Sequence, residues 1–425
     1  MVDGRLGLRP FLLGLVIFIK IVLFLLGMVM KFSTKVKAIR NGMEFGHGIR
    51  RALIVALALV YFVQMGFSVV YITTLFALSS IFTMLLEFPT GAVADYDSRK
   101  KSLMISYFLF TVAFLGIYFV SSFWLIAVFW VISDIAWTFT TGAGSAWAID
   151  ALGIGKKKSK IVKLMSRGYI FEKSGHIIGG LIGLVIIAIN FRLIWLVSGI
   201  VSLLIFLVIW KYMEERNFKP EVVSHGYLKK SWVKAKESYI FIFHKKNGNL
   251  RVIMFTSILA NIGWSIFTLA VPLFFVQTLR LRPEFYAGAL GIIAVLSLGA
   301  PLIAERFIGE KGFRRSLLIS SVVTGIMMIG IAFSSWIILA FLLFAVLKIF
   351  EVVLDVAESS ASHHEFDSKI RASLGSIGSI NWNVANSIGV FLAGIGIVMI
   401  GIANTLIVGG AIVFLTAFIY LLMKE

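Results

Sequence analysis

Long apolar segments, separated by short polar or basic links, repeat along most of the chain. Each is long enough to cross the ~30 Å hydrocarbon core of a bilayer as a helix. The segments do not alternate apolar and polar residues as the strands of a membrane β-barrel do, so the pattern predicts an all-α membrane protein. We expect twelve helices, at 52–68, 70–94, 102–120, 123–149, 169–189, 193–211, 252–279, 284–304, 315–333, 336–357, 371–398 and 400–422.

The longest polar stretch, at 211–251, divides these segments into six and six. This division predicts four parts of the chain: an N-terminal apolar segment at 1–42, a six-helix half at 43–211, a cytoplasmic linker at 212–250 and a second six-helix half at 251–425. Residues 10–30 are apolar apart from Lys20. Two interpretations of 1–42 stay open, an extra helix or a stretch that precedes a start at Met43.

Charge is distributed asymmetrically between the links. The chain has 40 Lys and Arg against 21 Asp and Glu, a net charge of +19. Alternate links carry most of the basic residues, and the intervening links hold only Arg192, Arg280 and Arg282. The positive-inside rule places the basic links in the cytoplasm. We therefore expect a multi-pass protein of the plasma membrane with a cytoplasmic C-terminus, and no nucleic-acid partner.

Composition excludes several kinds of chemistry. Hydrophobic residues make up 59% of the chain and charged residues 14%, which is too little polar surface for a soluble domain of this length. The chain has no cysteine, and no Gly-rich GK[ST] loop that would bind ATP. Adjacent His363 and His364 do not converge on one metal ion. We therefore expect no enzyme activity, no cofactor and no metal site.

The link after the second predicted helix resembles motif A of the major facilitator superfamily, G-x-x-x-D-R-x-G-R-K. It reads GAVADYDSRKK from position 91, and the matching residues are Gly91, Asp95, Arg99 and Lys100, whereas Tyr96 and Ser98 depart from the motif. The resemblance implies a cytoplasmic gate that holds the outward-facing state. Basic residues of this link are also expected to contact anionic lipid headgroups.

Further motifs are similar to one drug-exporter-like branch of that superfamily. They are EFPTG from Glu87, TGAGSAWAID at 141–150 and RAS at 371–373. The run Gly175-His176-Ile-Ile-Gly179-Gly180 resembles motif C of antiporters, with His176 in place of proline. The resemblance covers residues 50–425. It implies a twelve-helix major facilitator fold and proton-coupled export of hydrophobic or amphipathic small molecules, as in drug:proton antiporters.

Ionisable residues within apolar segments are the first candidates for coupling, because they are costly in a membrane. Asp134 is the only charged residue between 123 and 149, and Glu172, Lys348 and Glu351 lie in three other positions of this kind. Under the resemblance, helices 4 and 10 are equivalent in two repeats. We therefore expect Asp134 and Lys348 to approach one another in one conformational state, with Glu351 as the competing partner of Lys348.

Uncharged polar and aromatic residues in the predicted spans are candidates for the wall of a substrate cavity. They are Tyr61, Gln64, Trp137, Asn261, Trp264, Asn383 and Asn386. The partners we expect are a small-molecule substrate, protons and membrane lipids, with the protein acting as a monomer. Two other functions stay open, an importer of a sugar, peptide or other metabolite and a non-transporting membrane receptor or sensor.

Overall fold

The computed structural model of the protein describes residues 31–140, 143–154, 158–217, 248–365 and 371–423. Regular structure in these ranges is helical throughout. In the first half the helices are α2 (Phe32–Arg50), η1 (Arg51–Val55), α3 (Ala58–Gln64), α4 (Val69–Ala92), η2 (Val93–Asp97), α5 (Arg99–Phe119), α6 (Phe123–Thr140), α7 (Ala143–Ala151), α8 (Lys158–Ile189) and α9 (Leu193–Tyr212).

The second half follows after the segment 218–247, which lies outside the described residues. Its helices are α11 (Gly248–Leu273), η3 (Phe274–Thr278), α12 (Pro283–Leu296), η4 (Ser297–Gly299), α13 (Ala300–Phe333), α14 (Ile337–Glu365), α15 (Arg371–Met399), α16 (Ile402–Ile419) and η5 (Tyr420–Leu422). Eleven segments of the described chain are long and apolar enough to span a membrane. The longest, Pro283–Phe333, contains two of the expected spans, because only Gly312 (φ 75°) interrupts α13.

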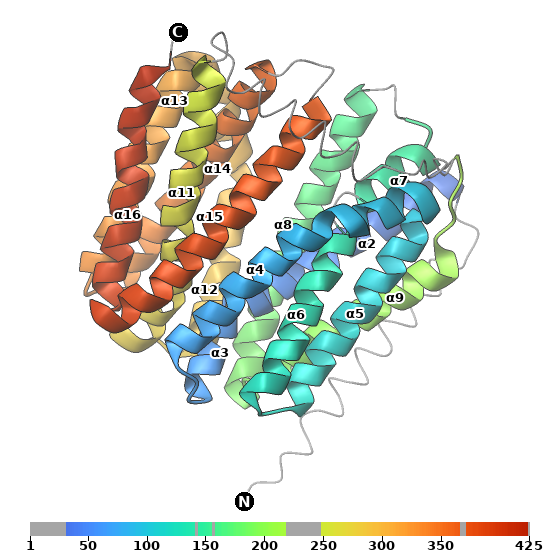
Figure 1. Cartoon of the computed structure of the whole chain (residues 1–425), viewed down its shortest axis with the longest axis horizontal. Coiled ribbons are helices and arrows are strands. Elements are labelled where there is room, and N and C mark those ends of the chain that lie inside the picture. Colours follow the sequence, from blue (N-terminus) through green and yellow to red (C-terminus); the bar gives the residue numbers. More distant parts are fainter. Residues whose placement is uncertain (1–30, 141–142, 155–157, 218–247, 366–370, 424–425) are drawn as a thin grey trace, which may run out of the picture.

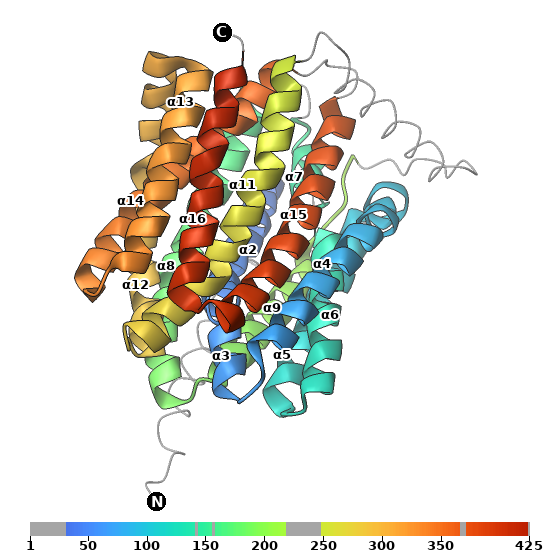
Figure 2. The same ribbon diagram turned by 60° about the vertical axis from the view of Figure 1, so that its left-hand side comes forward.

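The two halves form two bundles side by side (Figure 1). Helices α4 and α15 pack against each other across the boundary, as do α8 and α12. The turned view shows the same neighbours α4 and α15 (Figure 2). We call the end that holds residues 65–68 and 190–192 the turn end, and the end that holds residues 97–98 and 213–217 the link end. The predicted all-α fold of two six-helix halves is confirmed.

The first helix begins at Phe32, twenty residues before the expected start at 52. Its sequence is rich in charge, which is typical of a solvated link, but the bundle accommodates these charges. Arg40 is buried, donates to the carbonyl oxygen of Leu164 at 3.1 Å and pairs with Glu44 at 3.2 Å. The guanidinium of Arg50 lies 4.0 Å from the ring centroid of Phe110. Residues 32–42 therefore continue the first helix, and the expectations for 1–30 fall outside the described residues.

The turn between the first two spans lies close to its expected position. Helix α3 ends at Gln64 and α4 begins at Val69, so the chain reverses between them. Gly66 has a φ of 90°, a left-handed conformation that glycine adopts without a steric penalty. The turn thus lies within a few residues of the break expected between the helices 52–68 and 70–94.

Glycine lets α8 lie close to both of its neighbours. A β-carbon on Gly175 would be 2.0 Å from the carbonyl oxygen of Phe45 on α2, and one on Gly180 would be 2.9 Å from the α-carbon of Gly291 on α12. Small residues allow this kind of close approach between membrane helices. The motif C-like glycines therefore allow α8 to pack closely against α2 of its own half and against α12 of the other half.

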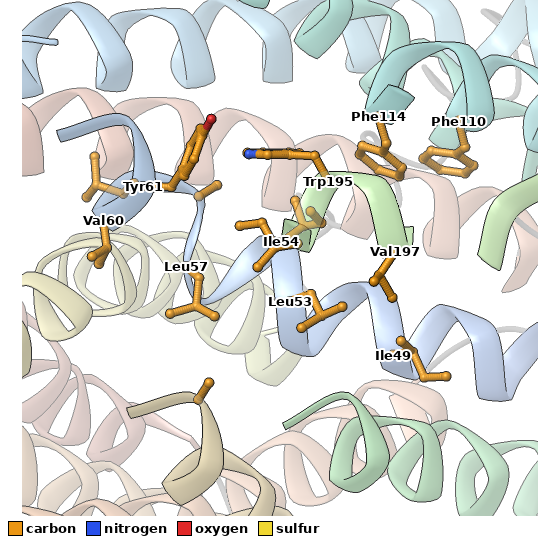
Figure 3. Close-up of a cluster of buried hydrophobic side chains, with 14 of the residues drawn as sticks. Ile49, Leu53, Ile54, Leu57, Val60, Tyr61, Phe110, Phe114, Trp195 and Val197 are labelled. Carbon is orange, nitrogen blue, oxygen red and sulfur yellow. The ribbon is translucent and has the colours of Figure 1, made fainter. Parts of the chain in front are cut away.

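The core of the first half is a cluster of buried hydrophobic side chains, with aromatic rings among the aliphatic ones (Figure 3). Trp195 of α9 is fully buried, and its ring stacks on Phe62 with centroids 5.3 Å apart. Tyr61 lies edge-on to the same ring, with centroids 5.5 Å apart. The ring of Phe114 stacks on Phe110 on α5, as the close-up shows. This cluster fixes the helices of the first half relative to one another near the turn end.

Candidate transport site

Asp134 lies near the middle of the span Phe123–Ala151, formed by α6 and α7. The hydroxyl of Ser79 on α4 donates a hydrogen bond to its carboxylate, and the indole of Trp130 faces it from the preceding turn. In the described part of the chain no charged side chain pairs with Asp134. A carboxylate in this setting can take up or release a proton without breaking an ion pair.

The charged residues of α14 form a second group. The ammonium of Lys348 bonds the carboxylate of Glu351 at 2.7 Å, one turn along the helix. It also lies 5.2 Å from the ring centroid of Trp264 on α11, within range of a cation–π interaction. In this conformation Lys348 therefore pairs with Glu351 and not with Asp134, and Asp134 is hydrogen-bonded to Ser79.

Glu172 on α8 belongs to a third group, in the first half. It accepts an ion-pair contact from Arg51 at 3.1 Å, and the side chain of Glu172 is only 16% exposed. The next residue, Lys173, interacts electrostatically with both Lys348 and Glu351. Charged groups of α8 and α14 therefore face each other across the boundary between the halves.

A polar contact joins the halves directly. The side-chain amide of Asn386 on α15 donates to the hydroxyl oxygen of Ser80 on α4 at 3.1 Å. The hydroxyl of Ser265 on α11 donates to the carbonyl oxygen of the same amide at 2.9 Å. Asn383 lies one turn before Asn386 and is buried. The expected polar face of α15 is thus turned towards its neighbours, and Asn386 holds α4, α11 and α15 together.

A sequence model of the Major Facilitator Superfamily matches residues 43–312, more than half of the chain. The chain belongs to the major facilitator superfamily. It is accordingly a multi-pass membrane transporter. No curated protein matches the sequence.

Several solved transporter structures have the same fold as this chain. The nucleoside transporter NupG has a TM-score of 0.74 at 15% identity, covering 93% of this chain and 100% of that one. A POT family transporter in complex with a thioalcohol-conjugated peptide has a TM-score of 0.74 at 14% identity, covering 91% and 95%. A D-xylose–proton symporter has a TM-score of 0.69 at 15% identity, covering 92% and 97%. At such low identity the likeness concerns the fold.

The motif A link of this major facilitator chain is bound to its own half. Arg99 forms an ion pair with Asp150 at the end of α7. The hydroxyl of Ser98 donates to Glu215 at 2.6 Å, and the backbone N–H of Lys100 donates to the same carboxylate at 3.1 Å. Glu215 thus lies at the N-terminus of α5, where the helix dipole favours an anion.

The remaining motif A residues lie at the end of α4 and in η2. Gly91 lies in the last turn of α4, and the backbone of Asp95 lies in η2, while the side chain of Asp95 is outside the described part. Glu87 is half-buried in the last turns of α4 and has an interaction partner. The gate role of the motif stays a prediction.

Several of the residues predicted to line a cavity lie away from the charged groups and from the polar contact between the halves. Tyr61 is in the aromatic core, where its hydroxyl accepts a hydrogen bond from Arg192 at 3.3 Å, and Gln64 is exposed at the end of α3. Trp137 stacks on His47 with centroids 5.0 Å apart. Asn261 donates to the hydroxyl of Ser257, one turn away on α11, at 3.2 Å. Of the cavity candidates, Trp264 and Asn386 contact the charged or inter-half groups described above.

Sequence reasoning missed the residues that partner these groups. Ser79 and Ser80 were unremarkable in an apolar helix, and Arg51 was assigned to the edge of a link. Adjacent hydroxyls in the middle of a span are a weak signal by themselves. Their importance follows from which helices lie on either side of α4.

Proposed function

We propose that the chain is a secondary active transporter that works by alternating access and couples transport to protons. Asp134 carries this proposal. It is a carboxylate near the middle of a membrane span, held by a serine hydroxyl, with no charged partner in the described part of the chain. Such a group changes charge when it exchanges a proton, and its free energy in the membrane then changes with the conformation around it.

The remaining charged groups fit a role in the conformational cycle. Glu172 with Arg51, and Lys348 with Glu351, form ion pairs within their own halves on opposite sides of the boundary. Rocking of the halves changes the distance between these pairs. The link end is the cytoplasmic end in this proposal, because its links carry the basic excess, and the motif A link then lies where a cytoplasmic gate acts.

For the direction of transport we propose export of hydrophobic or amphipathic small molecules from the cell. The support is the resemblance of three sequence motifs, at 87–91, 141–150 and 371–373, to the drug-exporter-like branch. Exposed aromatic side chains in the spans, such as Trp137 at 40% and Trp382 at 50%, suit molecules of this class.

Import is the second candidate function. The solved structures of similar fold include a nucleoside transporter, a POT family transporter in complex with a thioalcohol-conjugated peptide and a D-xylose–proton symporter. Charged groups on α8 and α14 would suit a polar substrate of such a kind. An importer would use the same carboxylate for coupling, with proton and substrate moving in the same direction.

Purified protein in lipid vesicles separates the two candidates. An imposed pH gradient should drive movement of a library of labelled amphipathic compounds, nucleosides, peptides and sugars. Export by exchange predicts that substrate moves against the direction of proton flow, and import predicts that both move together. No gradient-dependent movement of any compound would contradict proton coupling.

A further inference from the structure

Helix α4 stands between the candidate coupling carboxylate and the other half of the protein. On one side it packs against α6, which carries Asp134, and on the other side against α15. Ser79 and Ser80 are consecutive on α4, so their side chains point about 100° apart around the helix. Ser79 contacts Asp134 and Ser80 contacts Asn386.

The donors and acceptors of these contacts form a consistent set. Ser80 donates its own hydroxyl proton to the carbonyl oxygen of Phe76 at 3.1 Å, which leaves its oxygen free to accept from the amide of Asn386. The oxygen of that amide is occupied by Ser265. Asn386 therefore has a fixed orientation, and its bond to Ser80 depends on where α4 lies.

The same pair of helices touches closely nearer the turn end. A β-carbon on Gly394 of α15 would be 1.8 Å from the hydroxyl oxygen of Thr73 on α4, so no side chain larger than hydrogen fits there. Thr73 and Ser80 lie two turns apart on α4, as Gly394 and Asn386 do on the antiparallel α15. The polar contact and the close contact thus belong to one seam, which holds the halves together from mid-membrane towards the turn end.

We propose that Ser79 and Ser80 act as positioning residues that couple the protonation of Asp134 to this seam. The proposal rests on the proposed role of Asp134 in coupling. An ionised carboxylate is a stronger acceptor than a protonated one, so the ionised form holds Ser79 and fixes the rotation of α4. Protonation weakens this bond and frees α4 to turn. Because Ser80 is the next residue, the turn breaks its contact with Asn386 and lets α4 and α15 separate at the turn end.

Asp134 has no titratable neighbour whose protonation would be confused with its own among the described residues of α4, α5 and α6. The groups that face the carboxylate are Ser79 from α4 and Trp130 from α6 itself, and no charged or titratable side chain of the described α4, α5 or α6 interacts with it. Ser79 is itself fully buried. A pH response of the α4–α15 seam can therefore be assigned by changing Asp134 alone.

The test measures the separation of α4 and α15 at the turn end as a function of pH. The chain has no cysteine, so Tyr71→Cys and Val398→Cys, at exposed positions of α4 and α15, give a single pair of spin labels in the full-length protein. Pulsed electron paramagnetic resonance in lipid nanodiscs then measures the distance between the two labels. Short and long distances report the populations in which the seam is closed and open. In the otherwise unchanged protein the open population should rise as pH falls.

Substitutions in this labelled protein have distinct expected results. Ser80→Ala removes one inter-half hydrogen bond and should raise the ratio of open to closed seam about fivefold in alkaline buffer. Ser79→Ala should abolish the pH response, and Ser79→Thr, which keeps the hydroxyl, should restore it. Ser202→Ala is the matched control, since Ser202 is a buried serine of α9 that donates only to Ser198 of its own helix at 2.8 Å, and it should change nothing.

Two results would overturn the proposal, and they differ in what else they exclude. If Asp134→Asn abolishes the pH response but Ser79→Ala keeps it, the serines do not transmit the signal, although Asp134 still couples. If Asp134→Asn leaves the response intact, Asp134 is not the coupling group, and both the proposed function at this residue and the serine relay fail together.

Discussion

The ammonium of Lys348 lies 2.7 Å from the carboxylate of Glu351, one turn along the same helix. This contact decides between the two partners that the sequence allows for Lys348 in the conformation described here. Asp134, the other candidate, is bound to Ser79 on α4. The two acids thus occupy separate environments, one in an ion pair and one beside a hydroxyl.

A double-mutant cycle should show this separation. Lys348→Met leaves Glu351 without its cation, so we expect a large loss of transport that Glu351→Gln partly reverses. The coupling energy between the two should be about 0.5–3 kcal/mol, as for residues in direct contact. Lys348→Met and Asp134→Asn should instead be additive in transport rate. A strong coupling of Lys348 to Asp134, and none to Glu351, would show that transport depends on a different pairing.

The Arg99–Asp150 ion pair should stabilise the link end of the first half. Both side chains are partly buried, at 15% and 36% exposure, so an unpaired partner is costly. We expect Arg99→Ala to lower the free energy of unfolding by about 1–3 kcal/mol. Asp150→Ala should cost a similar amount, and the double variant little more than either. Thermal unfolding in detergent measures this, and fully additive losses would show that the pair contributes nothing.

Close packing of α2 on α8 should make Gly48 intolerant of a side chain. A β-carbon there would lie 2.0 Å from the carbonyl oxygen of Glu172, whereas one on Gly42 of the same helix meets nothing within 4 Å. Gly48→Ala should therefore lower the melting temperature by several degrees, since inserted atoms strain a packed interface by about 1–3 kcal/mol. Gly42→Ala should leave it unchanged or raise it, and equal melting temperatures for both variants would contradict this packing.

Glu214 contributes a pH-dependent part of stability beyond the end of α9. Hydrogen bonds from Lys35, at 2.9 Å, and from Arg216 hold the pKa of Glu214 below its usual value. A lowered pKa in the folded state contributes stability that is present above the ordinary carboxyl pKa and is lost as pH falls through the lowered one. The contact is exposed, so its contribution is below about 1 kcal/mol.

Glu214→Gln measures that contribution. The melting temperature of the unchanged protein should exceed that of the variant slightly at neutral pH, and the difference should disappear in acidic buffer. A difference that grows as pH falls would have the wrong sign.

Topology can be tested in the cysteine-free chain. A cysteine at Ser159, in the first turn of α8 and within the basic stretch predicted to be cytoplasmic, should be shielded from impermeant thiol reagents in intact cells. Arg282→Cys, in a link of the opposite set and 67% exposed, should be labelled from outside. Labelling of Ser159→Cys in intact cells would show that the protein has the opposite orientation in the membrane.

Hydrophobic patterning predicted the helical spans well because apolar length is a local property. It failed at 32–51, where charges indicate a solvated link but are held inside the bundle, as Arg40 is by the carbonyl oxygen of Leu164 and Arg50 by the ring of Phe110. Such partners come from distant parts of the chain or from packing. One sequence contains no direct record of them.

The site shows the same limit. Asp134 could be singled out from its isolation in an apolar segment, but its partner Ser79 follows from the rotation of α4 against α6. Tyr61 looked equally suited to a cavity, yet it packs on Trp195 in the core. Residue type and depth can be predicted from the sequence, whereas the face that a side chain presents is set by how the helices pack.

Substrate-induced proton flux is the most direct test of coupling through Asp134. Vesicles containing an internal pH dye and the purified protein are mixed with a substrate identified in the gradient screen. The unchanged protein and Glu310→Gln, which removes an exposed carboxylate paired with Arg306, should both show a substrate-dependent pH change. Asp134→Asn should bind substrate but show none. A pH change of undiminished rate in Asp134→Asn would contradict the account.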